Sequence, residues 1–304
     1  MQIGLAHDDS IVMEPTIAKS RSTELQPAGS WTRTLLLIRQ SLGVLRCDKK
    51  LLFFPAAAGV SALCVSISFV RPLLDDGAIN QYLEHGHIDR HTALWLFLWY
   101  YFHYFVILFF NSALTAATNR RMSGGDVSLR AGVLAAIDRL FPISMWTLVA
   151  STAGLGIRLF ESRSKRLSSA MAALIGLTWT FATYFIVPVL MFEEAGIRPA
   201  LKRSVQVTRQ TWGEQLVNQV SLGFITFLFA IPGLILAAAG LFISHALLLP
   251  AFIYALILSV VLSAARAIFT VALYRYAVTG EIPHGFSTSV IAGPASARVP
   301  VLAH

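Results

Sequence analysis

Charged side chains are scarce in this chain of 304 residues. Asp, Glu, Lys and Arg together make up 13% of it, whereas soluble domains carry roughly 25%. Hydrophobic residues make up 56%. Little charge combined with so much apolar side chain is typical of an integral membrane protein and excludes an ordinary soluble domain.

The sequence also lacks the features of known catalytic sites. Its two cysteines, Cys47 and Cys64, are too few for a disulfide framework, and we expect neither a disulfide nor a metal site from them. It contains no phosphate-binding loop, dinucleotide fingerprint or nucleophile elbow. No soluble stretch is long enough for a catalytic domain. We therefore predict no catalytic residue, no cofactor and no enzymatic activity.

A secretory signal is also missing. Residues 1–29 have no basic segment followed by an apolar core, so they predict a disordered cytoplasmic tail. The first apolar run begins at Leu51 and is expected to act as an uncleaved signal anchor. These features predict a transmembrane domain over residues 30–280 and a flexible cytoplasmic tail over 281–304.

Six long apolar runs are present instead. About 20 helical residues cross the roughly 30 Å hydrocarbon core of a bilayer. The runs lie at residues 51–70, 93–118, 141–157, 169–192, 216–241 and 247–270. They predict an all-α polytopic bundle of about six spans, arranged as three hairpins. Because the third run is short, the alternative is four spans plus a re-entrant pair formed by residues 141–192.

The distribution of positive charge predicts the orientation. Lys and Arg gather in cytoplasmic loops. Of the 24 Lys and Arg residues, 17 fall on the side of the N-terminus, 6 fall on the other side, and Arg266 lies within the sixth run. This favours a multi-pass protein of the inner (plasma) membrane with both termini in the cytoplasm. The segment 158–166 disagrees, because it places four basic residues on the outer side.

Three segments that precede the hairpins share a helical spacing of i, i+4, i+7 and i+11. The stripes are Trp31, Leu35, Ile38 and Leu42; Leu129, Val133, Ala136 and Leu140; and Leu201, Val205, Thr208 and Trp212. The second and third are offset by 72 residues, and Asp126 is placed to cap the second helix. The pattern predicts three repeated units, each an amphipathic surface helix followed by two spans.

Two interpretations of these surface helices remain open. Their apolar stripes can pack on the bundle, or their basic side chains can contact anionic lipid headgroups or a partner protein. The candidates for such contact are Lys202, Arg203, Arg209 and Trp212. We expect membrane lipids as partners, with a membrane protein or a second copy of the chain as alternatives. Nucleic acid is not expected, because no recognition motif accompanies the charge.

Polar residues inside apolar runs are candidates for a functional site, because burying them in lipid is costly. Asn111 in the second run and Arg266 in the sixth predict an intramembrane polar site. The alternative is that Arg266 extends its side chain toward the headgroups. Glu193 and Glu194 close the fourth run, and we expect Glu193 to pair with Arg198 or Lys202.

Two further patterns are weaker. Four prolines within the runs predict helix kinks, at Pro55, Pro188, Pro232 and Pro250. The loop "EHGHIDRH" offers His85, His87 and His91 as metal candidates, since His87 and His91 have the i, i+4 spacing that metal sites use. The loop lacks the glutamate between histidines of metalloproteases, so no metal is predicted.

Several segments together resemble a family of bacterial six-span membrane proteins known as domain of unknown function 6159. They are "SW" (30–31), "DKKLLFFP" (48–55), "FFNSAL" (109–114), "GGD" (124–126), "VPVLMFEEAGIRPALKRS" (187–204), "TWGE" (211–214) and "AIFTVALYRYAVTGEIPHGF" (267–286). The resemblance covers about residues 30–286. A looser similarity extends to the membrane part of glycerophosphodiester phosphodiesterases, without their catalytic domain. The resemblance implies fold and location but no catalytic residue.

The sequence thus favours a non-enzymatic membrane scaffold or a module that interacts with lipids or a partner. The alternative is a small transporter or channel that uses the proline-kinked spans.

Overall fold

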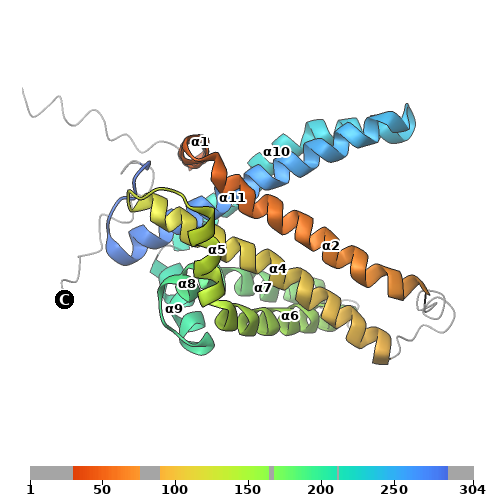
Figure 1. Ribbon diagram of the computed structural model, residues 1–304, viewed down its shortest axis with the longest axis horizontal. Helices are drawn as coiled ribbons and strands as arrows, with labels where there is room; N and C mark the ends of the chain where they lie inside the picture. Colours follow the sequence, from red (N-terminus) through yellow and green to blue (C-terminus); the bar gives the residue numbers. More distant parts are fainter. Residues whose placement is uncertain (1–29, 76–89, 164–167, 211, 287–304) are drawn as a thin grey trace, which may run out of the picture.

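The computed structural model describes residues 30–75, 90–163, 168–210 and 212–286, and within them every regular element is a helix (Figure 1). This confirms the predicted all-α class. The elements are α1 (Ser30–Cys47), the 3-10 turn η1 (Lys49–Leu52), α2 (Phe53–Asp75), α4 (Arg90–Met122), α5 (Leu129–Asp138), α6 (Leu140–Arg163), α7 (Ser168–Ala182), α8 (Ile186–Phe192), α9 (Ile197–Gln210), α10 (Trp212–Phe242), the 3-10 turn η2 (His245–Leu247) and α11 (Leu248–Thr279).

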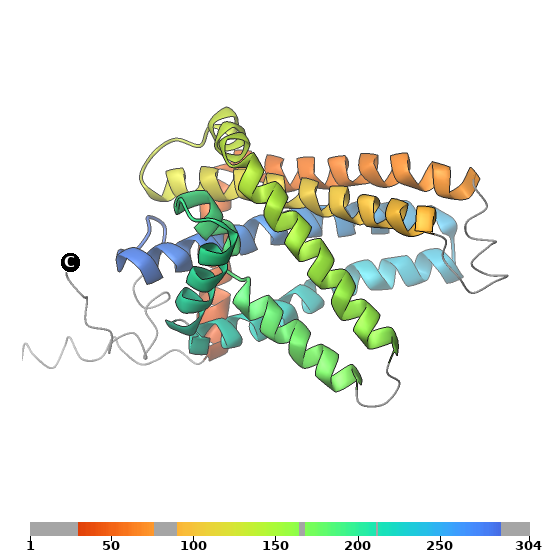
Figure 2. The same cartoon turned by 90° about the horizontal axis from the view of Figure 1, so that it is seen from below.

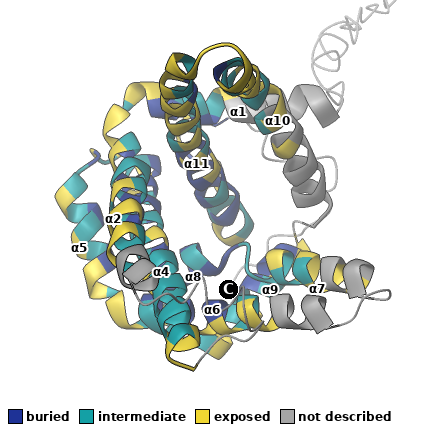
Figure 3. Ribbon diagram, turned by 90° about the vertical axis from the view of Figure 1, so that its right-hand side faces the viewer, coloured by how far each residue is buried: buried dark blue, intermediate teal, exposed yellow. Residues whose placement is uncertain are grey.

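The helices form three hairpins. Helix α2 packs on α4, α6 on α7, and α10 on α11, and a shorter helix precedes each hairpin. The three hairpins extend away from α1, α5 and α9 in one direction, so the units repeat in parallel (Figures 1 and 2). Seen from the hairpin tips, they surround a common centre (Figure 3).

Four helical segments in the described part of the chain can cross a membrane by length and composition. They are Lys49–Phe69, Arg90–Met122, Leu174–Phe192 and His245–Thr279. Helices α5 and α6 become a fifth if they count as one span bent by 69°, and the apolar segment Thr226–Phe242 is shorter. The structure therefore confirms a membrane helical bundle, and the count of six spans stays a prediction.

The repeat offset of 72 residues aligns the starts of two hairpins. Leu140 is the first residue of α6 and Trp212 is the first residue of α10, so both belong to the hairpins and not to the surface helices before them. Leu140 is 43% exposed, so it does not extend the buried face of α5, which holds Gly132 and Ala136. The predicted cap, Asp126, is also wrong. Ser128 caps α5 by accepting a hydrogen bond from the Ala131 amide at 3.3 Å, because an N-cap must directly precede the first turn.

The predicted stripes of α9 and α1 can be compared with the faces that these helices bury. The buried face of α9 holds Ala200, Ser204, Val207 and Thr208, which is one residue away from the predicted stripe except at Thr208. The shift arises because α9 packs through buried hydroxyl groups as well as apolar ones. In α1, Leu42 packs against the core, and the side chains of Trp31, Leu35 and Ile38 lie outside the described part.

Burial is concentrated where α1, α5 and α9 meet the hairpins. Phe54, Trp146, Phe185 and Ile268 are fully buried there, and Trp146 stacks on Trp179 at 5.9 Å. The hairpin arms instead expose large apolar side chains, including Leu174, Phe227, Phe229, Leu234, Phe252 and Ile257. Exposed apolar arms fit a lipid environment, whereas the compact end is held together by protein contacts.

The four prolines behave less uniformly than predicted. Pro55 and Pro250 are the third residues of α2 and α11, where a backbone donor is not needed, so the predicted kinks there are wrong. Pro188 is the third residue of α8 and follows the break between α7 and α8. Pro232 lies inside α10.

Candidate functional site: a cavity between the hairpins

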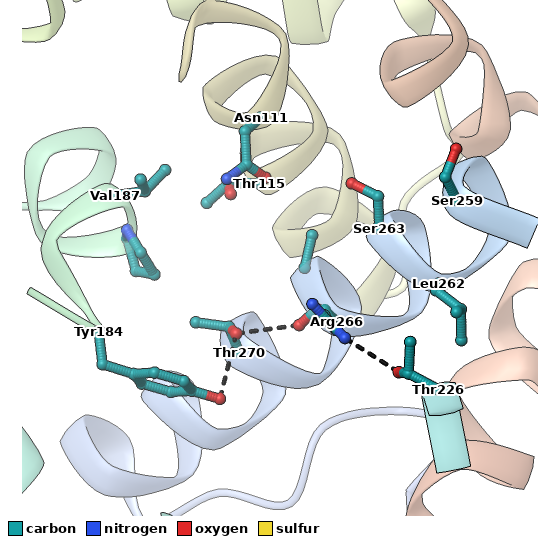
Figure 4. Close-up of a pocket in the computed structure, with 12 residues that line it drawn as sticks. Asn111, Thr115, Tyr184, Val187, Thr226, Ser259, Leu262, Ser263, Arg266 and Thr270 are labelled. Carbon is teal, nitrogen blue, oxygen red and sulfur yellow. Dashed lines mark hydrogen bonds between the residues drawn. The ribbon is translucent and has the colours of Figure 1, made fainter. Parts of the chain in front are cut away.

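A cavity of about 410 Å³ lies where the three hairpins meet (Figure 4). Helices α4, α10 and α11 and the junction between α7 and α8 contribute to its wall. The polar lining residues are Asn111, Thr115, Tyr184, Thr226, Ser259, Ser263, Arg266 and Thr270. The structure thus brings Asn111 and Arg266, the two predicted intramembrane polar residues, to one cavity.

Helix α11 presents a polar stripe to this cavity. Ser259, Ser263, Arg266 and Thr270 are spaced i, i+4, i+7 and i+11, so they share one face of the helix. The same spacing was noted for the surface helices, but in the sixth run only Arg266 was singled out. Hydroxyl residues in helical register with an intramembrane arginine are the signal that could have revealed the others.

Arg266 is the cation of the cavity. Its guanidinium donates a hydrogen bond to Thr226 Oγ1 of α10 at 2.9 Å, and its side chain is exposed. In the described part of the chain no carboxylate forms an ion pair with it. The guanidinium has five N–H donors and therefore keeps donors for a ligand.

Arg266 and Asn111 lie at a similar depth. Arg275 bonds to the carbonyl and side-chain oxygens of Asn119 at 3.3 and 3.1 Å, which joins α11 to the C-terminal end of α4. From that level Arg266 is nine residues away and Asn111 eight, or about 12–14 Å at 1.5 Å per residue. The two polar residues are therefore nearly the same distance from the contact between Arg275 and Asn119, so they share one level of the bundle.

The junction between α7 and α8 is held by α9. Where helix α7 ends, the Ser204 hydroxyl donates to the Ala182 carbonyl at 2.7 Å and accepts from the Phe185 amide at 3.2 Å. The Thr208 hydroxyl donates to the Phe181 carbonyl at 3.0 Å. A helix break leaves backbone groups unpaired, and in a dry environment these two hydroxyls satisfy three of them.

Glu193 connects three helices at the end of α8. Its Oε1 accepts from Arg203 Nε of α9 at 3.0 Å and from the Tyr274 hydroxyl of α11 at 2.7 Å. The predicted partners, Arg198 and Lys202, are both exposed, so that pairing is wrong. Arg203 pairs with Glu193 instead of Lys202 because Arg203 is next to the buried residue Ser204, one position nearer the buried face of α9.

The basic side chains of α9 therefore divide into two groups. Arg203 is held by Glu193, whereas Arg198, Lys202 and Arg209 are exposed. With Gln206 they are spaced i, i+4, i+8 and i+11, which forms one exposed stripe. The side chain of Trp212 lies outside the described part.

Of the three weak metal candidates, the structure describes only His91. His91 stacks on Trp95 with ring centroids 6.5 Å apart. His85 and His87 lie outside the described part, and no group of three ligand-type side chains occurs within it.

Comparison with known proteins identifies one family. The profile described as "Family of unknown function (DUF6159)" matches residues 91–285. The match includes the cavity and leaves out the segment 30–90, which also carried the predicted resemblance. No curated protein and no solved structure matches the chain, so the looser similarity to phosphodiesterases has no support there.

Proposed function

The chain belongs to the DUF6159 family of unknown function, and we propose that it is a non-enzymatic membrane protein that binds an anionic amphiphile, such as a phospholipid, through Arg266. The supporting observation is a guanidinium inside the apolar helical segment His245–Thr279 whose described protein partner is a neutral hydroxyl, Thr226. A charge in that place is costly unless an anion accompanies it. We propose an inner-membrane location with both termini in the cytoplasm, as the distribution of Lys and Arg favours.

The ligand is proposed to carry one negative charge. Arg266 is the only charged side chain among the described residues that line the cavity, so it balances a single anionic group. The exposed hydroxyl of Ser263 can donate a further hydrogen bond to a phosphate oxygen. The apolar arms leave room for acyl chains among the surrounding lipids.

Replacing Arg266 with Gln tests the proposal. The purified protein in neutral detergent is titrated with short-chain phosphatidylglycerol, with the matching phosphatidylcholine and with inorganic phosphate. A hydrogen bond to a charged group contributes about 1.5–3 kcal/mol. We therefore expect Kd for phosphatidylglycerol to rise about 10- to 100-fold in Arg266→Gln and less in Arg266→Lys.

Arg130→Gln is the matched control, because it removes the same charge from an exposed position on α5, outside both the cavity and α9. Its affinity should stay that of the parent protein. Equal affinity of the parent and Arg266→Gln for phosphatidylglycerol would reject the proposal. Tighter binding of inorganic phosphate than of the lipid would identify a soluble anion as the ligand.

A transporter is the second candidate, and the polar stripe of α11 favours it. From Ser259 to Tyr274 the stripe covers 15 residue steps, or about 22 Å of a roughly 30 Å hydrocarbon core. Flux of the bound anion across proteoliposomes, lost in Arg266→Gln, would support transport over binding alone.

The exposed stripe of α9 is proposed to contact anionic headgroups. Each Lys or Arg near an anionic surface contributes about 1 kcal/mol. We expect that replacing Arg198, Lys202 and Arg209 together with Gln lowers the enrichment of spin-labelled phosphatidylglycerol around the protein in nanodiscs several-fold. Arg203→Gln alone should change it little, because Arg203 is bound to Glu193. Unchanged enrichment in the triple variant would rule out this contact.

A further inference from the structure

Helix α8 forms one wall of the cavity. Tyr184 and Val187, at its beginning, line the cavity (Figure 4), as does Pro188. Val189 and Leu190 are buried on the protein core. The helix has only seven residues and is bounded on both sides by non-helical backbone. The break at residues 183–185 precedes it, and Glu193, in extended conformation, follows it.

Both ends of α8 are fastened to the same surface helix. At its beginning the Phe185 amide is bonded to Ser204 of α9, and Ser204 and Thr208 also hold the last carbonyls of α7, at Ala182 and Phe181. At its end Glu193 is bonded to Arg203 of α9 and to Tyr274 of α11. A short rigid piece between two breaks can rotate as a unit, and its position then depends on α9.

Aromatic side chains pack together beside these attachments. The rings of Phe185 and Phe192, which flank and end α8, lie 6.0 and 5.8 Å from the ring of Tyr274. Tyr274 follows Thr270 by one helical turn on the polar stripe and is only 4% exposed. The stripe that lines the cavity therefore continues into a sealed region under α8 and α9.

We infer that α8 is a lid that closes the cavity at the end facing α9, and that Glu193 latches it to Arg203 and Tyr274. This inference rests on the proposed function, because a lid is useful only if the cavity takes a ligand. Loss of the latch frees the end of α8, separates Phe192 from Tyr274, and opens the polar stripe to water on the side of α9. Glu193 is thus a positioning residue that acts on access and not on the bound anion.

Cysteine accessibility tests the latch without any ligand. Cys47 and Cys64 are exposed and are first replaced by Ser. Ser263→Cys then reports on the cavity, and Gln206→Cys, on the exposed face of α9, identifies which side of sealed membrane vesicles α9 occupies. The probe is the membrane-impermeant anion sulfonatoethyl methanethiosulfonate. From the α9 side, we expect Ser263→Cys to be labelled at least tenfold faster when Glu193→Gln is added.

Glu194→Gln is the matched control. Glu194 is the next residue, carries the same charge, is 90% exposed and pairs with Arg139 at 3.3 Å, outside the latch. It should leave the labelling rate unchanged. Tyr274→Phe removes one hydroxyl from the latch with little change in packing and should accelerate labelling about threefold, which keeps the test decisive if Glu193→Gln does not fold.

Parent-like labelling in Tyr274→Phe and in folded Glu193→Gln would overturn the lid, as would equal acceleration by Glu194→Gln. The outcome is separable from that of the proposed function. Accelerated labelling in a protein that binds no phosphatidylglycerol would reject the ligand and keep the lid. Binding of phosphatidylglycerol that depends on Arg266, together with unchanged labelling, would support the ligand and reject the lid.

Discussion

Replacing Gly132 with Leu is expected to destabilise the protein by about 3 kcal/mol or more, and Gly132→Ala by about 1–2 kcal/mol. A Cβ atom at Gly132 would lie 2.9 Å from the Ala113 carbonyl oxygen, 2.9 Å from Phe54 Cζ and 3.3 Å from Ala117 Cβ. The backbone of α5 thus meets α4 directly, as small residues permit in helical membrane proteins. Since two of the three atoms belong to backbone or a buried ring, they cannot move aside cheaply.

The measurement is unfolding in detergent, followed by tryptophan fluorescence during an SDS titration. Gly59→Ala serves as the control, because a Cβ there meets nothing within 4 Å and the position is inside α2. We expect it to be neutral or stabilising by up to about 1 kcal/mol, since Ala loses less backbone entropy than Gly in a helix. Equal stability of Gly132→Ala and Gly59→Ala would contradict the close packing of α5 on α4.

Removing the Ser204 hydroxyl is expected to have the second large effect. Ser204→Ala leaves the Ala182 carbonyl and the Phe185 amide without their side-chain partner at a buried site. Each unpaired buried group costs about 1–3 kcal/mol, so we expect a loss of about 2–4 kcal/mol in the same SDS titration. Thr208→Val, which removes one hydrogen bond to the Phe181 carbonyl, should cost about half as much.

Thr178→Ala is the matched hydroxyl deletion on α7. Its side chain is exposed and, among the described residues, bonds to the Leu174 carbonyl of its own helix, so the change should stay within about 0.5 kcal/mol. If Ser204→Ala is as stable as Thr178→Ala, the hydroxyls of α9 do not hold the break between α7 and α8, and the lid loses one of its two attachments.

Much of the architecture was predictable because lipid imposes simple rules on sequence. Each apolar run became a helix or a pair of helices that starts within four residues of its predicted start. Three helices continue more than four residues past the predicted ends: α2 from 70 to Asp75, α6 from 157 to Arg163 and, by the most, α11 from 270 to Thr279. There Val271, Ala272 and Leu273 are buried in protein and Gly280 ends the helix with φ 70°. Hydropathy indicates where a span could leave lipid, whereas a helix that is buried in protein can continue past that point, which explains the error.

The candidate site was predictable only in part. Asn111 and Arg266 stand out because polar groups are rare in spans, but the sequence did not place them together. Their distance depends on how α4 and α11 pack at the Arg275 level. The partner of Glu193 was mispredicted for a similar reason, since three basic residues of α9 lie within reach along the chain and only helix rotation selects Arg203.

The sequence by itself determined the helical membrane class, the three repeated units and the positions of the apolar helices, because hydrophobic length and helical spacing are local properties. Only the tertiary structure decided that the polar stripe of α11 faces a cavity, that α9 holds the broken helix, and that Glu193 joins Arg203 to Tyr274. Those features depend on how distant helices pack. In the cavity, for example, Arg266 bonds to Thr226, 40 residues away, and Thr270 bonds to Tyr184, 86 residues away, and no local pattern encodes such contacts.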